Sequence, residues 1–160
     1  MQKFKVYFWK NLPKKMFKEI KNRYKENKKD YITVYVCDTF EEMYKLGDKL
    51  EKEELEKNYG ARTFCYTKNY WNIETGEYVK TSHDCGHILF NKEYFYADSV
   101  SHEVSHAIVG YFSRKIKEKE EIFCKTDKYG KILKENDEIE ELFCYMLGNI
   151  TNEIFCQVDV

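Results

Sequence analysis

Apolar and polar residues alternate along several short stretches in the first part of the chain. Two of them, 3–9 and 31–37, place apolar side chains at every second position, which is the spacing of a β-strand. The stretches 61–66 and 86–90 are expected to be two further strands. The Thr75-Gly76 pair predicts a turn into one more extended stretch at 78–80. These stretches predict a small β-sheet.

Between and after these strands, apolar residues recur every three or four positions, which is the spacing of a helix. Pro13 is placed to open one helix, and Thr39 and Glu42 form a capping box for another that should end at Gly60. Two longer patterns follow, at about 98–116, capped by Asp98 or Ser99, and at about 137–155. The chain therefore predicts an α+β fold, a small mixed sheet with N-terminal strand–helix units and two long helices, in one domain spanning 1–160.

Composition narrows the class of protein. Apolar residues make up 42% of the chain and aromatic residues 17%, which favours a packed core over disorder. The net charge is −1, with Lys and Glu interleaved, so we expect no nucleic-acid partner. No apolar run reaches the length of a membrane span and no signal peptide is evident, so we expect no membrane partner and a cytoplasmic location.

The six cysteines show no C-x-x-C pairing. Without a secretory signal we expect reduced thiols, most of them small core residues. A structural zinc site built from cysteines is a weaker alternative, because no two of them lie close in sequence.

The strongest chemical signal is His102-Glu103-x-x-His106, within the helical pattern at 98–116. On a helix, two histidines four residues apart lie on the same face, where their ring nitrogens can share one Zn²⁺. Glu103, beside the first histidine, can then reach a water on the metal. Both histidines fall outside the apolar stripe, so they are either polar residues on a solvent-facing surface or ligands in a cleft. We favour the interpretation that the two histidines are metal ligands in a cleft.

A catalytic zinc needs a third protein ligand. A third histidine in the pattern H-E-x-x-H-x-x-G-x-x-H is excluded, because Val109 and Phe112 occupy the glycine and histidine positions. A carboxylate from the last helix remains. Glu141 is preferred over Glu138 and Glu140, because it lies opposite the apolar stripe in line with two small residues that would let the helices approach closely. These small residues are Cys144 and Gly148.

These motifs resemble the zincin metallopeptidases of gluzincin type, and among them the short ImmA/IrrE-like proteins of phages and mobile elements. The resemblance covers about residues 84–156 and includes a strand before the motif helix and a later E-x-x-small-x-x-x-small segment starting at Glu141. It implies a zincin-like fold, a zinc cofactor and Glu141 as third ligand. The chain departs from the family at Cys144-Tyr145 and in a long charged insertion at 117–136.

The mechanism implied is hydrolysis of a peptide bond by zinc-activated water, with Glu103 as general base. The strand at 86–90 is expected to be an edge strand that holds an extended peptide substrate. A donor to the oxyanion is also required, and its candidates are Tyr145, His83 and His87.

Three functions compete at this point. The first is a zinc-dependent endopeptidase acting on an intracellular protein. The second is a non-enzymatic mobile-element binding protein whose zinc is structural or vestigial, and the third is a metal-free interaction domain. The presence of Glu103 favours the first, because a purely structural zinc site has closed coordination and no base.

Overall fold

A computed structural model describes residues 1–66, 70–72, 74–79, 82–116, 124–126, 128–129, 132–135 and 137–159. Its centre is a mixed sheet of four strands in the order β1-β2-β6-β3. β1 pairs antiparallel with β2, β2 parallel with β6, and β3 antiparallel with β6. The four strands are β1 (Gln2–Tyr7), β2 (Tyr31–Cys37), β3 (Ala61–Cys65) and β6 (Asp84–Asn91). The α+β class with a mixed sheet is confirmed.

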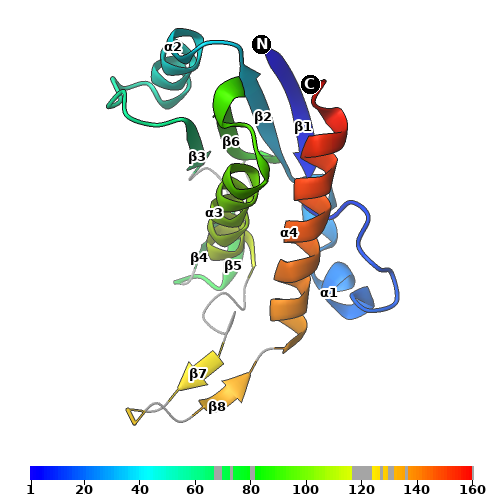
Figure 1. Ribbon diagram of the computed structural model, residues 1–160. Coiled ribbons are helices and arrows are strands. Elements are labelled where there is room, and N and C mark those ends of the chain that lie inside the picture. Colours follow the sequence, from blue (N-terminus) through cyan, green and yellow to red (C-terminus); the bar gives the residue numbers. More distant parts are fainter. Residues whose placement is uncertain are drawn as a thin grey trace.

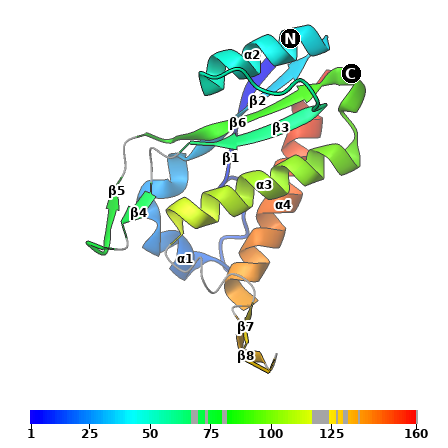
Figure 2. The same cartoon turned by 90° about the vertical axis from the view of Figure 1, so that its left-hand side faces the viewer.

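Helices cover both faces of this sheet (Figure 1). Figure 2 views the sheet from its edge, with α2 on one side and α3 and α4 on the other. The helices are α1 (Lys18–Arg23), α2 (Phe40–Glu51), α3 (Ala97–Lys115) and α4 (Asp137–Gln157), with short 3-10 turns at Lys25–Lys29 and Lys92–Tyr94. Within the described ranges, no helix combines the length and apolar character needed to cross a membrane.

Two small hairpins lie outside the central sheet. One pairs β4 (Tyr70–Asn72) with β5 (Glu77–Val79), and its turn contains Gly76 at φ 66°, as the Thr75-Gly76 pair predicted. The other pairs β7 (Cys124–Thr126) with β8 (Ile132–Glu135), inside the insertion at 117–136. This second hairpin was not predicted. Lys80, the end of the expected stretch at 78–80, and residues 117–123 lie outside the described residues.

Alternation along the central strands produces the two layers. In β2, Ile32, Val34 and Val36 join the main core with α3 and α4, as their spacing predicted. Tyr35 and Cys37, on the opposite face, pack with Met43 of α2 and Leu89 of β6. Both faces of the central strands are therefore buried.

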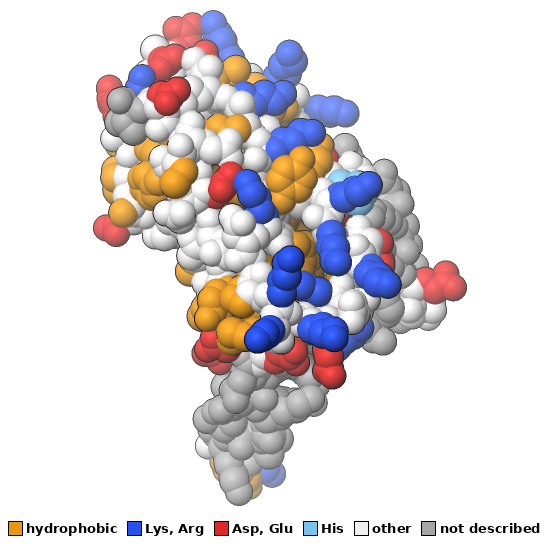
Figure 3. Space-filling view, turned by 90° about the vertical axis from the view of Figure 1, so that its right-hand side faces the viewer, with side chains coloured by type: hydrophobic (Ala, Val, Ile, Leu, Met, Phe, Trp, Pro, Cys, Tyr) orange, Lys and Arg blue, Asp and Glu red, His pale blue; other side chains and the backbone are white. Residues whose placement is uncertain are grey.

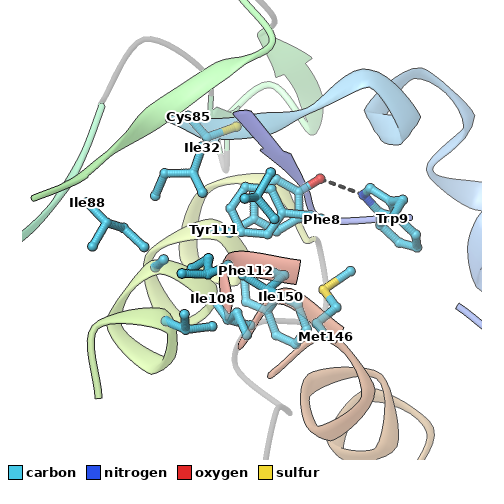
Figure 4. Packing of buried hydrophobic residues seen from close by; sticks show 14 of the residues in the cluster. Phe8, Trp9, Ile32, Cys85, Ile88, Ile108, Tyr111, Phe112, Met146 and Ile150 are labelled. Carbon is cyan, nitrogen blue, oxygen red and sulfur yellow. Dashed lines mark hydrogen bonds between the residues drawn. The ribbon is translucent and has the colours of Figure 1, made fainter. Parts of the chain in front are cut away.

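The core continues from the sheet into the N-terminal segment (Figure 4). The rings of Phe8 and Tyr111 stack with centroids 4.0 Å apart. Trp9 Nε1 donates to the Tyr111 hydroxyl at 2.7 Å, and that hydroxyl donates to Asp30 Oδ2 at 2.8 Å. These contacts attach the segment before α1 to the last turns of α3.

Asp30 is the centre of a buried polar network at the end of α3. Its Oδ1 lies 3.5 Å from Lys115 Nζ and 2.9 Å from His83 Nδ1, and neither the Asp30 nor the Lys115 side chain is more than 2% exposed. A buried charge of this kind is tolerated because its partners are in place. The network fixes the end of α3 relative to the starts of β2 and β6.

The N-terminal and C-terminal segments of the described chain also meet. Gln2 Nε2 donates to the carbonyl of Asp159 at 2.9 Å, and the Asp159 amide donates to Gln2 Oε1 at 3.1 Å. Because α4 also contacts β1, the C-terminal helix is held directly against the first strand.

Three predicted helix boundaries were wrong. α1 begins at Lys18 rather than at Pro13, because a helix that started at Pro13 would place Lys14 and Lys15 in its first turn, at the positive end of the helix dipole. Met16, in the stretch between Pro13 and α1, is 50% exposed.

α2 starts as predicted, with Thr39 Oγ1 accepting from the Glu42 amide at 3.1 Å, but it ends at Glu51 rather than at Gly60. Lys52 takes a left-handed conformation, φ 58°, and Asp48 Oδ1 accepts from the Leu55 amide at 2.9 Å, so the chain turns away from the helix axis.

The predicted N-cap of α3, Asp98 or Ser99, was also wrong. The cap is Tyr96, without a side-chain hydrogen bond. Asp98 lies inside the first turn, where its negative charge complements the helix dipole.

Candidate functional site

The motif helix presents two different faces. Its apolar stripe is buried against the sheet and α4, whereas His102, His106 and Val109 are exposed on the other side. Glu103 lies between these faces and is 8% exposed. The helical spacing therefore places the residues that pack in the core on one face of α3 and the two histidines on the other.

The two histidines converge. His102 Nε2 and His106 Nε2 are 3.1 Å apart, and the ring planes make an angle of 79°. In a tetrahedral zinc site with Zn–N distances of about 2.0–2.1 Å, two nitrogens lie about 3.3 Å apart. The imidazole pair thus fits two ligands of one zinc ion.

Glu103 is held by the neighbouring strand. Thr63 of β3 lies with its Oγ1 2.6 Å from Glu103 Oε2 and 3.0 Å from the Glu103 carbonyl oxygen. The other carboxylate oxygen, Oε1, lies 4.0 Å from His102 Nε2. The motif glutamate is therefore positioned beside the histidine pair by a residue from a distant part of the chain.

A groove of about 430 Å³ runs along α3 and β3 at this point. Its lining includes Arg62, Thr63, Cys65, Glu103, His106, Val109, Gly110 and Arg114. Burial raises the pKa of the Cys65 thiol, with Arg114 opposing the shift. The thiol therefore stays protonated at neutral pH, so the groove offers a carboxylate and imidazoles rather than a thiolate.

The edge strand beside the groove is β3, not the stretch 86–90, so that expectation was wrong. β6 lies inside the sheet, between β2 and β3. The Tyr66 amide donates to the Cys85 carbonyl and the Asn91 amide to the Gly60 carbonyl, each at 2.9 Å.

In an antiparallel ladder this register directs the backbone groups of even-numbered residues towards β6. The amides and carbonyls of Ala61, Thr63 and Cys65 consequently point to the outer edge, beside Glu103.

The structure does not bring Glu141 to the histidines. Glu141, Glu138 and Glu140 are all exposed on α4. In the part of the chain that is described, no third His, Cys, Asp or Glu joins the pair in a group suited to a metal ion. α4 faces α3 through Phe143, whose ring centroid lies 6.0 Å from that of Phe112. Glu141 is two residues away, so it falls on the opposite side of the helix.

The expected close approach through small residues of α4 was wrong. Cys144 is exposed, and a Cβ added at Gly148 would meet no atom within 4 Å. The close approach lies at Gly110 of α3 instead, where an added Cβ would collide with Cys65 Sγ of β3. The tight contact at the site is thus between α3 and the edge strand.

The proposed oxyanion donors lie apart from the histidine pair. Tyr145 packs edge-on against Phe17, with centroids 5.6 Å apart, on the side of α4 away from Phe143. His83 contacts Asp30 in the buried network. His87 is buried on the α2 side of the sheet, with Nδ1 3.0 Å from the Tyr66 hydroxyl and Nε2 3.6 Å from Glu51 Oε2.

Two residues of the groove were missed from the sequence, Thr63 and Arg114. Nothing in the local pattern of 61–66 marks Thr63, which lies forty residues before its partner Glu103. Arg114 donates to the Gly110 carbonyl at 3.0 Å, which holds its guanidinium along the groove. Its helical spacing, two turns after the second motif histidine, was a signal that could have been used.

Comparisons of the chain with protein-family models, with curated proteins and with solved structures found no match.

Proposed function

We propose that the chain is a zinc-dependent endopeptidase of zincin-like type that cleaves an intracellular protein, with His102 and His106 as zinc ligands and Glu103 as general base. The observation that carries the proposal is the 3.1 Å separation of the two Nε2 atoms beside a buried glutamate. A closed structural zinc site has no need of a base at that position.

Zinc held by the histidines would supply a Lewis acid for a peptide carbonyl and would lower the pKa of water at the site. Glu103 takes the proton of the attacking water and returns it to the leaving amine. Thr63 holds Oε2 of that carboxylate, which leaves Oε1 turned towards His102. The hydroxyl thereby orients the base.

The third ligand in this proposal is a carboxylate of α4. Glu141 is preferred because of the resemblance to gluzincins, and Glu138 and Glu140 are the alternatives. Glu141 lies on the side of α4 that faces away from α3, so its assignment as third ligand rests on the resemblance alone.

The substrate in this proposal is an extended peptide paired with the outer edge of β3. The outward backbone groups of Ala61, Thr63 and Cys65 supply the hydrogen bonds of an added strand. Such a strand would pass along the groove in front of Glu103 and His106, and Arg114 would be a cationic donor at its end.

The test combines metal content with cleavage. Wild type, His106→Ala, Glu103→Gln and Glu141→Ala are purified without chelators or metal-affinity resin, loaded with zinc, and analysed by elemental analysis and on a peptide library. Ser113→Ala, at an exposed position of the same helix outside the lining of the groove, is the control. We expect about one zinc per chain in the wild type, the control and Glu103→Gln, and a loss in His106→Ala and Glu141→Ala. Cleavage should disappear in Glu103→Gln alone among the zinc-loaded variants.

A second function is favoured by one observation, since no third ligand joins the histidines among the described residues. In that case the chain binds a partner protein and its zinc is not catalytic. Zinc binding with no cleavage of any peptide, and with full biological activity in Glu103→Gln, would establish this function in place of the first.

A further inference from the structure

A second pocket lies beside β1, at the edge of the sheet opposite the one that adjoins the candidate zinc site. It has a volume of about 460 Å³ and is lined by Tyr7, Trp9, Lys10, Lys14, Lys21 and Lys28. A volume of this size accommodates a small-molecule ligand.

The lining of this pocket is positively charged, because it contains four lysines and no carboxylate. Residues 1–30 contain eleven Lys and Arg but only three Asp and Glu, although the whole chain has a net charge of −1. Figure 3 shows Lys and Arg side chains gathered on the face that carries α1 and α4. The N-terminal segment is therefore a concentrated positive region in a nearly neutral protein.

The lysines of the pocket act on one another. The pKa of Lys21 is lowered by partial burial and by the positive charges of Lys28 and Lys14. Its Nζ donates to the Leu12 carbonyl at 3.0 Å, which fixes its position. Among the described residues, Lys14 and Lys28 have no ion-pair partner, so an anion in the pocket would relieve the mutual repulsion.

The cluster of positive charges formed by Lys14, Lys21 and Lys28 ends at Lys10. Lys10 Nζ lies 3.1 Å from Glu153 Oε1, so this lysine is already paired with α4. A long polyanion that continued past Lys10 would meet this carboxylate. The arrangement therefore favours a compact anion held by Lys14, Lys21 and Lys28.

The aromatic part of the pocket is rigid. Trp9 is 6% exposed, is stacked with Tyr24 at a centroid distance of 6.1 Å, and is hydrogen-bonded to Tyr111. Tyr7 is 39% exposed and lies 5.8 Å from Tyr31. The exposed ring of Tyr7, with the edge of Trp9, lies beside three ammonium groups, which suits a ligand that carries both an aromatic ring and a phosphate.

We propose that this pocket binds a nucleotide, with its phosphates at Lys14, Lys21 and Lys28 and its base against Tyr7 and Trp9. This site is independent of the proposed peptidase activity. The phosphates supply the negative charge that the lining lacks, and the base covers the exposed ring of Tyr7.

The test is calorimetric titration of the whole chain with four probes: ADP, adenosine, inorganic phosphate and a short oligothymidylate. We expect ADP to bind more tightly than adenosine and than phosphate, with an affinity that falls as salt is raised. Lys14→Glu combined with Lys28→Glu should weaken ADP binding by about tenfold or more. The control, Lys49→Glu combined with Lys128→Glu, makes the same charge change at exposed positions outside the pocket and should leave the affinity unchanged.

Each other outcome overturns the proposal. Failure of ADP to bind at millimolar concentration would overturn it, and so would equal weakening of ADP binding by the two double variants. Phosphate binding as tightly as ADP would remove the role of the base, and oligothymidylate binding more tightly than ADP would identify a nucleic-acid strand as the ligand. Circular dichroism of all variants excludes loss of fold as the cause, and none of these readouts depends on zinc or on cleavage.

Discussion

The hydroxyl of Thr63 joins the edge strand to the motif helix through Glu103. Its oxygen lies 2.6 Å from the carboxylate Oε2 and 3.0 Å from the carbonyl of the same residue. Because the backbone groups of Thr63 point to the outer edge of the sheet, a strand added there would pair with the same residue that holds Glu103. Substrate pairing and the general base are thus set by one residue in the proposed mechanism.

Replacement of Thr63 should affect both stability and chemistry. Thr63→Val keeps the shape but leaves the buried carboxylate without its donor, so we expect the free energy of unfolding to fall by about 1–3 kcal/mol. Thr63→Ser, which keeps the hydroxyl, should lose much less. Urea unfolding measures this, and equal stability of the Val and Ser variants would show that the hydrogen bond contributes nothing.

Two helical glycines should respond in opposite directions to alanine. At Gly110 the new Cβ would collide with Cys65, so Gly110→Ala should lower the free energy of unfolding by about 1–3 kcal/mol. At Gly148 the space is open, and Gly148→Ala should raise it by about 0.5–1 kcal/mol through helix propensity. Thermal or urea unfolding gives both values. A Cys65→Ala change should relieve the cost at Gly110, and no relief would mean that the collision is not its cause.

Stability should fall in mild acid because of His87. Burial lowers the pKa of His87 below its ordinary value of 6.5, so the unfolded chain takes up a proton at a pH where the folded chain does not. This contribution to the free energy of unfolding is complete above about pH 6.5 and decreases as the pH falls below that value. His87→Gln should show a smaller decrease than the wild type in urea midpoints measured between about pH 7.5 and 5.5.

His102→Gln separates this effect from the loss of any histidine, because His102 is exposed on α3. The assignment to His87 fails if the buried and the exposed variants change the pH profile by the same amount.

The cysteines should differ in their rate of alkylation according to their burial. Cys144 and Cys156 are exposed, whereas burial raises the pKa of Cys37 to about 11 and that of Cys85 to about 12. Iodoacetamide at about pH 8 should therefore modify the first pair in the folded chain and the second pair only in urea, because the thiolate is the reactive form. Peptide mass spectrometry resolves each site. Equal rates for Cys37 and Cys144 would contradict the burial of Cys37.

The sequence was sufficient where the signal is local. The spacing of Ile32, Val34 and Val36 identified both β2 and its main buried face. The i, i+4 spacing of His102 and His106 was enough to predict that their rings converge, since a helix alone fixes that geometry. These features depend on residues a few positions apart.

The order of the strands could not be obtained in the same way. β3 and β6 have similar apolar content, and only the pairing of Thr63 with Ile88 decides which of them lies at the edge. The orientation of α4 is equally non-local, because the contact of Phe143 with Phe112 turns Glu141 away from α3. Hydrophobic periodicity defines a buried face but not the neighbour that covers it.

The reciprocal hydrogen bonds of Gln2 and Asp159 have a consequence for biosynthesis. β1 is synthesised long before α4, the helix that covers it, which is completed only after residue 157 has been added. Until then Val6 and its neighbours on β1 lack much of their apolar surroundings, and the contact between the ends spans 157 positions. Packing of the core around β1 should therefore wait for the synthesis of α4, and the nascent N-terminal half should depend on chaperones to avoid aggregation.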